Sequence, residues 1–205
     1  FGKESDIYIT DPKMMKTVLV DKDQEPVLQE NYQAIADELE AAGMPVDKVS
    51  MEVWYKYACE ANGKLYSVLF QQNTETHTTD YTYEKGTPPQ NAYEIAITPM
   101  IADQLGVEIG DTVTIDFGTE KRDCVVTALF QTMNQLGKVG RLHEEAPTSM
   151  KYSTTMPGFQ VDFSDHPDEK EIRTRVKKIK ELYGITGVFD AAGYCVDCMG
   201  VGDTM

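Results

Sequence analysis

The sequence predicts an α+β fold with two lobes. Residues 5–58 and 157–190 each show the pattern strand, helix, strand, and they bracket a middle segment that is rich in strands and turns. The two β-α-β units are expected to form one mixed sheet lobe, with both long helices on one face. That lobe would comprise residues 1–60 and 151–205, and residues 61–150 would form an inserted β-rich lobe.

The first β-α-β unit begins with a short strand and continues with the clearest helical pattern of the chain. Ile7 and Ile9 alternate with other residues until Pro12 stops the strand. Between residues 27 and 42, apolar side chains recur at three- and four-residue spacing, which predicts a helix that Gly43 ends. Those apolar positions are Leu28, Tyr32, Ile35, Ala36 and Leu39.

Strands are expected at residues 48–58 and 64–71, joined by the hairpin pair Asn62-Gly63. Trp54 alternates with the apolar residues of the first strand and therefore faces away from them. An exposed tryptophan marks a contact site, whereas one covered by the neighbouring lobe is a packing residue. Covering is the simpler interpretation, and Trp54 stays a candidate for partner contact.

Residues 72–82 are polar and without periodicity, which indicates a surface loop. His77 lies in this loop near Glu75 and Asp80, and these residue types can bind metal ions. Three such residues within one loop are usually coincidental. No metal site is therefore predicted.

The middle of the chain, residues 83–130, has the most definite local pattern. A short apolar strand at 94–98 leads to Thr98, whose hydroxyl is expected to cap a helix that starts at Pro99. Gly106 would end that helix in a left-handed conformation. Two further strands, 113–117 and 124–130, follow the turn at Gly110.

Residues 137–158 form a long segment with glycines, prolines and no clear period, which is typical of a binding element, a lid or a mobile segment. Met133, Met150 and Met156 lie in or near it. Methionine side chains suit adaptable apolar contacts, but they equally fill gaps in a core. Both interpretations remain open, and these methionines join Trp54 as candidate residues for partner contact.

The second β-α-β unit has a strand around Phe159–Phe163, a helix to Leu182 and a closing strand at 185–189. Ser164 and Asp165 are expected to cap the helix. Its basic residues predict a solvated face, suited to docking an acidic partner. They are Arg173, Arg175, Lys177, Lys178 and Lys180.

Four cysteines do not form a disulfide framework in a chain of this length. Cys59 and Cys124 lie in apolar runs and are expected to be buried free thiols. Cys195 and Cys198 form a Cys-x-x-Cys pair in the tail. No helix of useful length is expected there, so a thiol-active enzyme is the weakest hypothesis.

The net charge of −15 is unevenly distributed, because residues 1–120 hold 22 Asp/Glu against 8 Lys/Arg. This acidity repels nucleic-acid backbones, and nucleic acid is excluded as a partner. It favours cationic peptides, although solubility alone would also account for it. The sequence shows no nucleophile motif, phosphate-binding glycine loop or zinc-protease motif, so we expect no enzyme, cofactor or bound metal.

The order EIAIT, helix, LGVEIGD, TVTIDF, hairpin and VVTALF follows a Y-x-x-G-x-x-P segment. It resembles the extracytoplasmic domain of FtsX-like ABC transporter permeases, also called the MacB-like periplasmic core domain. The resemblance is sharpest over residues 83–142 and carries no catalytic residue. It implies a two-lobed, non-catalytic domain on the extracytoplasmic side of the cell membrane, cut from a longer membrane protein.

The resemblance further implies that flanking transmembrane helices couple the binding of a substrate or partner to a cytoplasmic ABC ATPase subunit. The client would be a cationic peptide or an extracytoplasmic protein. The same middle segment also resembles one half of a double-psi β-barrel, as in substrate-recognition domains of AAA-type ATPases. That fold requires a second copy of the motif, and the sequence contains no second LG-x-x-x-GD pattern.

Overall fold

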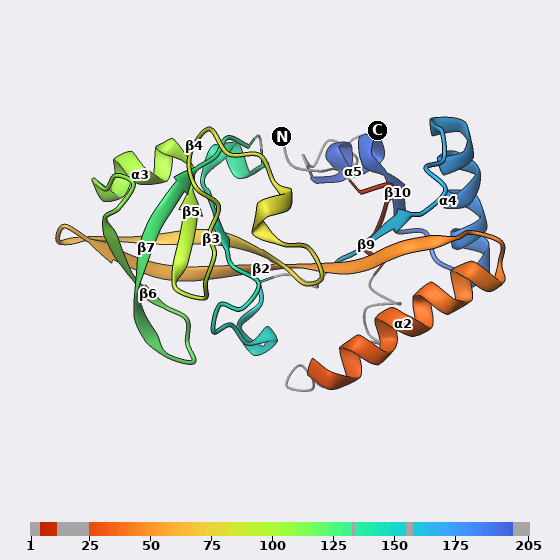
Figure 1. Cartoon of the computed structure of the whole chain (residues 1–205), viewed down its shortest axis with the longest axis horizontal. Helices are drawn as coiled ribbons and strands as arrows, with labels where there is room; N and C mark the ends of the chain where they lie inside the picture. The colour runs from red at the N-terminus through yellow and green to blue at the C-terminus, as the bar shows by residue number, and fades with distance from the viewer. Residues whose placement is uncertain (1–4, 12–24, 133, 155–157, 199–205) are drawn as a thin grey trace. The chain divides into compact units, whose positions relative to one another are not determined.

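The computed structural model describes residues 5–11, 25–132, 134–154 and 158–198. The chain divides into two compact units (Figure 1). We call the unit within Val53–Thr155 the barrel unit, and the unit within Glu4–Glu52 and Met156–Met205 the interleaved unit. Among the described helices, none has the length and apolar character that a membrane crossing requires.

The interleaved unit contains four strands in the order β10-β1-β9-β2, and every neighbouring pair is antiparallel. The strands are β1 (Ile7–Ile9), β9 (Gly158–Phe163), β10 (Val188–Asp190) and the first half of β2 (Val46–Ala61). Helix α2 (Glu25–Ala41) connects β1 to β2, and α4 (Glu169–Tyr183) connects β9 to β10. Each β-α-β unit therefore places one strand between the two strands of the other, in a split β-α-β arrangement.

The two faces of this sheet differ in polarity. Ile7 and Val49 both lie opposite Val161, so their side chains share an apolar face. Ile35 and Leu39 of α2 and Ile179 of α4 are buried, as the expected helical spacing requires. The ammonium of Lys178 on α4 lies 3.5 Å from the carbonyl of Ala42, just after α2, which agrees with both long helices covering one face.

The opposite face is polar and is covered by a short helix, α5 (Ala191–Cys198). The ring of Tyr194 stacks on that of Tyr8 with their centroids 4.1 Å apart. Glu52 is buried here, where it accepts a hydrogen bond from Gln160 Nε2 at 2.8 Å and one from the Tyr194 hydroxyl at 3.4 Å. The expectation that no helix fits the tail was wrong, because α5 begins directly after β10.

The start of α4 also differs from the expected one. Asp168, rather than Ser164 or Asp165, is the N-cap, and its carboxylate accepts the backbone N–H of Glu171. Asp165 instead binds both terminal nitrogens of Arg175, at 2.8 and 2.5 Å. Arg175 was expected on the solvated face, but it lies one turn from the buried Ile179 and is buried with it.

The barrel unit closes six strands into a ring. Its order is β2, β3 (Lys64–Asn73), β8 (Val139–Leu142), β5 (Glu94–Ile97), β7 (Lys121–Leu129) and β6 (Thr112–Asp116), and β6 pairs back to β2. The pairs β3–β8 and β5–β7 are parallel, so the whole sheet is mixed. Closure leaves no free edge in the ring, and β4 (Lys85–Gly86) adds to the outside of β7.

The turns of the barrel unit follow the expected glycine chemistry. Asn62 and Gly63 both have positive φ angles, as a two-residue hairpin of the predicted kind needs. Helix α3 (Pro99–Leu105) ends at Gly106, whose φ of 68° is left-handed. The Thr98 hydroxyl does not cap α3, because it donates to the carbonyl of Gly137 instead.

The segment 137–158 was expected to have no regular structure, but its described part is ordered. Strand β8 lies inside the ring between β3 and β5. Short 3-10 helices precede and follow it, at Asn134–Gly137 and Met150–Tyr152. Four residues were too few to show a period in the sequence, which is why β8 was missed.

Candidate functional site

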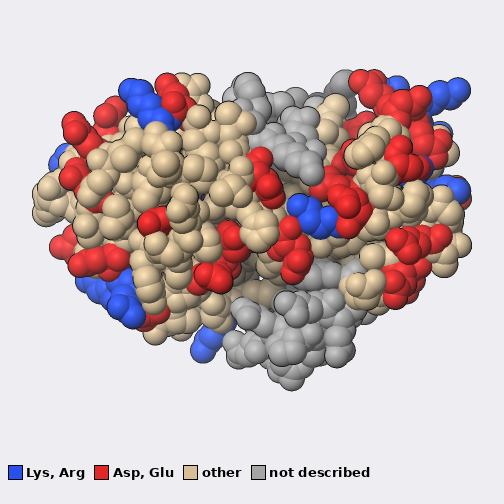
Figure 2. Space-filling model, in the orientation of Figure 1, with Lys and Arg blue, Asp and Glu red and all other residues tan. Residues whose placement is uncertain are grey.

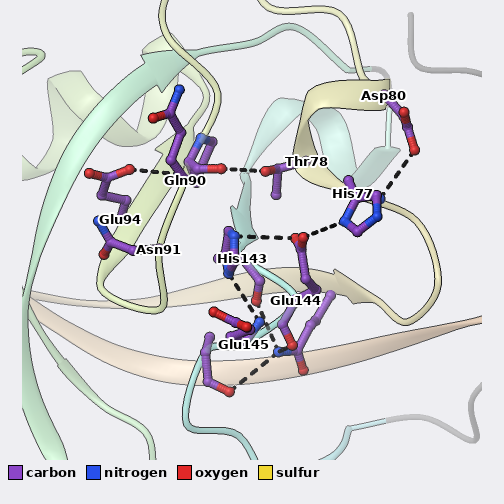
Figure 3. Close-up of polar contacts among 12 residues, drawn as sticks. His77, Thr78, Asp80, Gln90, Asn91, Glu94, His143, Glu144 and Glu145 are labelled. Carbon is purple, nitrogen blue, oxygen red and sulfur yellow. Dashed lines mark hydrogen bonds and ion pairs between the residues drawn. The ribbon is translucent and has the colours of Figure 1, made fainter.

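A polar cluster on the barrel unit is centred on Glu144, at the end of β8 (Figure 3). One carboxylate oxygen lies 2.7 Å from Nδ1 of His77, and the other lies 3.6 Å from Nε2 of His143. The backbone N–H of Thr78 also bonds to this carboxylate. Glu144 thus connects the residues after β8 to the short 3-10 helix Thr78–Asp80.

These contacts change the acidity of Glu144. Partial burial favours the neutral acid, but it is outweighed by hydrogen bonds from His77 and from backbone N–H groups, and the neighbouring His143 adds to the lowering. The pKa of Glu144 is therefore lowered. A carboxylate in this environment stays ionised at neutral pH and acts as an acceptor rather than a general acid.

Thr78 secures the same loop from its other side. Its hydroxyl donates to the carbonyl of Pro89, and its own carbonyl accepts the Tyr83 hydroxyl at 2.8 Å. Figure 3 draws the first of these bonds as a dashed line at Thr78. The loop after β3 is therefore held by hydrogen bonds at several points, and these bonds also position the residues that follow it.

The histidines do not form a metal site with the neighbours considered from the sequence. The Asp80 carboxylate accepts the backbone N–H of His77, and Nδ1 of His143 accepts the backbone N–H of Glu145. Among the described residues, no three His, Cys, Asp or Glu side chains are arranged to hold a metal ion. The cluster joins two loops, the one after β3 and the one after β8.

Gln72 orders the residues that follow β8. Its amide nitrogen donates to the carbonyls of His143, Glu144 and Ala146, at 3.1 to 3.4 Å. Its amide oxygen accepts the hydroxyl of Thr148 at 2.5 Å. Gln72 thus makes four hydrogen bonds to the turn at residues 143–148, which favours a surface held to β3 over a lid.

An aromatic cage around Arg141 lies close to the Glu144 cluster. The central carbon of the guanidinium is 3.9 Å from the ring centroid of Tyr81, 4.4 Å from that of Phe130 and 5.4 Å from that of Tyr83. Burial raises the pKa of Tyr83, the charge of Arg141 and a side-chain hydrogen bond from Arg141 oppose this rise, and Glu144 adds to it. Sequence reasoning missed the cage because its members come from three separate segments.

Trp54, kept as a candidate for partner contact, is partly buried beside this cage. It packs with Tyr83 against a buried cluster formed by Ala96, Ala128, Phe130 and Val139. Met150 is 5% exposed, which fits the alternative that it fills a gap in the core. Met133 and Met156 lie outside the described residues, so Trp54 alone of the four lies partly at the described surface.

The cysteines show no reactive environment where they are described. Cys59 and Cys124 are buried free thiols on β2 and β7, as expected. Burial is the main cause that raises the pKa of each to about 12. Cys195 and Cys198 fall in the last turns of α5, whereas a thioredoxin-like pair opens its helix.

Comparisons with known proteins agree with this architecture. No family model matches the chain, and no curated protein matches it significantly. The periplasmic region of MacB from Actinobacillus actinomycetemcomitans is similar in structure, with a TM-score of 0.54 and 9% identity over 100% of this chain and 95% of that one. The extracellular domain of the ABC-type transporter YknZ from Gram-positive bacteria has a TM-score of 0.50 and 8% identity, over 92% of this chain and 99% of that one. The resemblance seen in the sequence is thus confirmed at the level of the fold.

Proposed function

We propose that this chain is the extracytoplasmic domain of an FtsX-like ABC transporter permease. It binds a substrate or partner outside the membrane and makes no covalent bonds itself. Flanking transmembrane helices then couple that binding to a cytoplasmic ATPase subunit. The observation that carries the proposal is the match to the periplasmic region of MacB, which spans the whole chain.

The alternative, a double-psi barrel of an AAA-type ATPase, is not favoured. The segment that suggested it contributes β5, β6 and β7 to the ring. The structural matches extend over the interleaved unit as well, because they cover 92% to 100% of the chain. A double-psi barrel would correspond to the barrel unit at most and would leave the interleaved unit unmatched.

The location is tested by labelling a cysteine in the full-length protein in intact cells. Glu108 is exposed on the turn after α3, and Glu108→Cys is made with Cys195 and Cys198 changed to Ser. A membrane-impermeant maleimide should label this variant before the cells are permeabilised. The parent without the new cysteine should stay unlabelled, because Cys59 and Cys124 are buried. Labelling only after permeabilisation would place the domain inside the cell and reject the proposal.

Coupling is tested separately, with the full-length permease and its ATPase in lipid vesicles. Purified vesicles are assayed for ATP hydrolysis with the client added on the side of this domain. The proposal expects that replacing the domain with a short linker abolishes the client's effect and leaves basal hydrolysis. An unchanged response to the client would show that the domain takes no part in coupling.

The client we propose is a cationic amphipathic peptide. The net charge is −15, and Figure 2 shows Asp and Glu side chains on the visible face of both units. The electrostatic field of these negative charges attracts cationic ligands and accelerates their association with the domain. Because salt shortens the Debye length to about 8 Å at physiological strength, the attraction should fall steeply as salt is added.

Calorimetry with a panel of basic amphipathic peptides at low and high salt tests this client. Binding heat should appear at low salt and fade at high salt, and a matched acidic peptide should give none. A folded domain that gives no heat at low salt would leave an extracytoplasmic protein as the client. Deleting residues 137–158 is not a valid control, because it would remove β8 from the ring.

A further inference from the structure

Arg141 is a buried cation on an inner strand of the barrel unit. Its side chain projects from β8, which is paired on both sides, and the residue is 8% exposed. Tyr81, Phe130 and Tyr83 surround the guanidinium at the distances given above. Aromatic faces attract a cation, and these contacts account for part of its stability in the interior.

The aromatic rings contact the face of the guanidinium, but its N–H groups have few hydrogen-bond acceptors. Nη2 lies 3.5 Å from the Gln71 amide oxygen, at the outer limit of a hydrogen bond, and the Tyr83 hydroxyl also forms a side-chain hydrogen bond with the guanidinium. Nε and Nη1 are buried and have no hydrogen-bond acceptor among the described residues. Both edges of the planar group, the one with Nε and the one with Nη1, therefore keep an unpaired donor.

Arg175 shows what a satisfied buried arginine looks like in the same chain. Its side chain is as deeply buried and also stacks on a ring, that of Phe163. Two carboxylates complete it, Asp165 on the terminal nitrogens and Glu171 on Nε at 3.2 Å. Arg141 has the ring contacts without the carboxylates, although the chain holds 34 Asp and Glu residues.

This difference has an energetic consequence. A buried charged donor without an acceptor loses its hydrogen bonds to water and forms no hydrogen bond in the protein. This costs more free energy than the loss of a hydrogen bond between neutral groups. Ring faces interact with the face of the guanidinium and leave the buried N–H groups of Nε and Nη1 unpaired. An oxyanion in the guanidinium plane would complete the same set of contacts that Arg175 has.

We propose that Arg141 and the aromatic cage form a binding site for a single carboxylate, with Tyr81 as the movable cover. The Tyr81 side chain is partly exposed and its ring lies over the guanidinium, so turning it aside would open a path from the surface to the buried N–H groups. Tyr83 and Trp54, which pack on the same apolar cluster, would contact the apolar part of the acid. A planar carboxylate fits the fork of an arginine between rings better than a tetrahedral anion does.

The test observes the side-chain Nε–H of Arg141 by ¹H–¹⁵N NMR while sodium acetate is added at constant ionic strength. Loss of one signal in Arg141→Lys assigns the resonance, and the Nε–H of Arg175 is the internal control. We expect a saturable shift of the Arg141 signal alone, with a Kd on the order of 1–10 mM. Tyr81→Ala should bind acetate more tightly, because the cover is removed.

Two further comparisons separate the sources of a carboxylate. A peptide C-terminus is represented by N-acetyl-phenylalanine, with its amide as control, and a free inorganic anion is represented by phosphate. The acid should bind more tightly than acetate, and its amide and phosphate should cause no saturable shift. Saturation by phosphate equal to that by acetate would overturn the specificity for carboxylates.

Thermal stability gives a second readout that does not need the NMR assignment. Acetate should raise the Tm of the wild-type domain and of Arg175→Lys, and it should not raise that of Arg141→Met. Without acetate, Arg141→Met should keep or exceed the wild-type Tm, because an unpaired buried charge is removed. An Arg141 signal that stays fixed up to about 100 mM acetate in both wild type and Tyr81→Ala would overturn the site and leave internal water as the acceptor. This outcome does not depend on the transport role.

Discussion

A methyl group at position 140 would collide with the ring of Phe70. Gly140 lies on β8 directly opposite Phe70 of β3, and two ring carbons occupy the space where a Cβ would be placed. Both residues are buried inside the closed ring, so neither can move into solvent. We expect Gly140→Ala to lower the free energy of unfolding by about 1–3 kcal/mol through overpacking. Urea denaturation measures it, and the double variant with Phe70→Leu should recover part of the loss.

Gly110 tests backbone strain without such a collision. Its φ is 99°, and a Cβ there would meet no atom within 4 Å. Gly110→Val should still cost about 1–3 kcal/mol, because a β-branched residue strongly disfavours this region. Recovery by Gly110→Asn, a residue that tolerates positive φ, would attribute the loss to strain. An unchanged Tm in the valine variant would contradict the positive φ angle assigned to this turn.

The two buried thiols should be inert in the native domain. With Cys195 and Cys198 changed to Ser, an aromatic disulfide reagent at pH 8 should titrate no thiol until denaturant is added, and then two. The reason is that pKa values of about 12 leave almost no thiolate at pH 8 and burial blocks access. Fast reaction of either thiol in the native state would show that β2 or β7 opens readily.

Single residues with a local rule were predictable from the sequence, and residues that depend on distant partners were not. Asn62-Gly63 and Gly106 need only their own φ angles, and both were identified. The contact between His77 and Glu144 joins residues 67 apart, and the Gln72 contacts join residues about as far apart. No spacing rule connects such pairs, so the Glu144 cluster and the Arg141 cage required the folded structure.

At the scale of an element, the Glu144 carboxylate fixes the short 3-10 helix Thr78–Asp80 against the end of β8. Because its pKa is lowered in the folded state, its contribution to stability is present above its ordinary unfolded pKa and is lost as the pH falls through the lower folded pKa. Glu144→Gln should therefore lower the Tm at pH 7 by more than at pH 3. Glu145→Gln, next to it and exposed, is the matched control and should change the Tm little at either pH. Equal losses at both pH values would mean that the carboxylate charge has no role.

Element type followed from periodicity where elements were long. Helices α2 and α4 each show their apolar stripe over four turns, and both were predicted close to their observed bounds. Strand β8 has four residues and α5 has eight, and neither was recognised. Arg175 was assigned to the solvated face because of its charge, although its position one turn before Ile179 indicated the buried face.

At the scale of the whole molecule, the division into two lobes was proposed from the alternation of patterns, and its boundaries stay a proposal. Contacts within the structure divide the chain at residues 52 and 53, in the middle of β2. The boundary predicted from the sequence, between residues 60 and 61, lies at the end of the same strand. Strand β2 shows one continuous alternation, so its change of partner from β9 to β6 left no signal in the sequence.

We predict that residues 53–155 fold without the rest of the chain. The ring of six strands closes within this segment, so its removal from the chain exposes no unpaired strand in the ring. The two ends of the segment are also tied together. The Trp54 carbonyl accepts the backbone N–H of Thr154 at 2.9 Å and its hydroxyl at 3.0 Å, and Tyr55 pairs with Ser153.

The isolated segment should give a dispersed ¹H–¹⁵N spectrum and one cooperative thermal transition. Gly140→Ala should destabilise it by the same amount as in the full chain, since Phe70 is present in both. Arg141 should also keep its acetate-dependent shift, because the whole cage lies inside the segment. A segment that melts without cooperativity, while the full chain melts normally, would mean that the interleaved unit is needed to hold the ring closed.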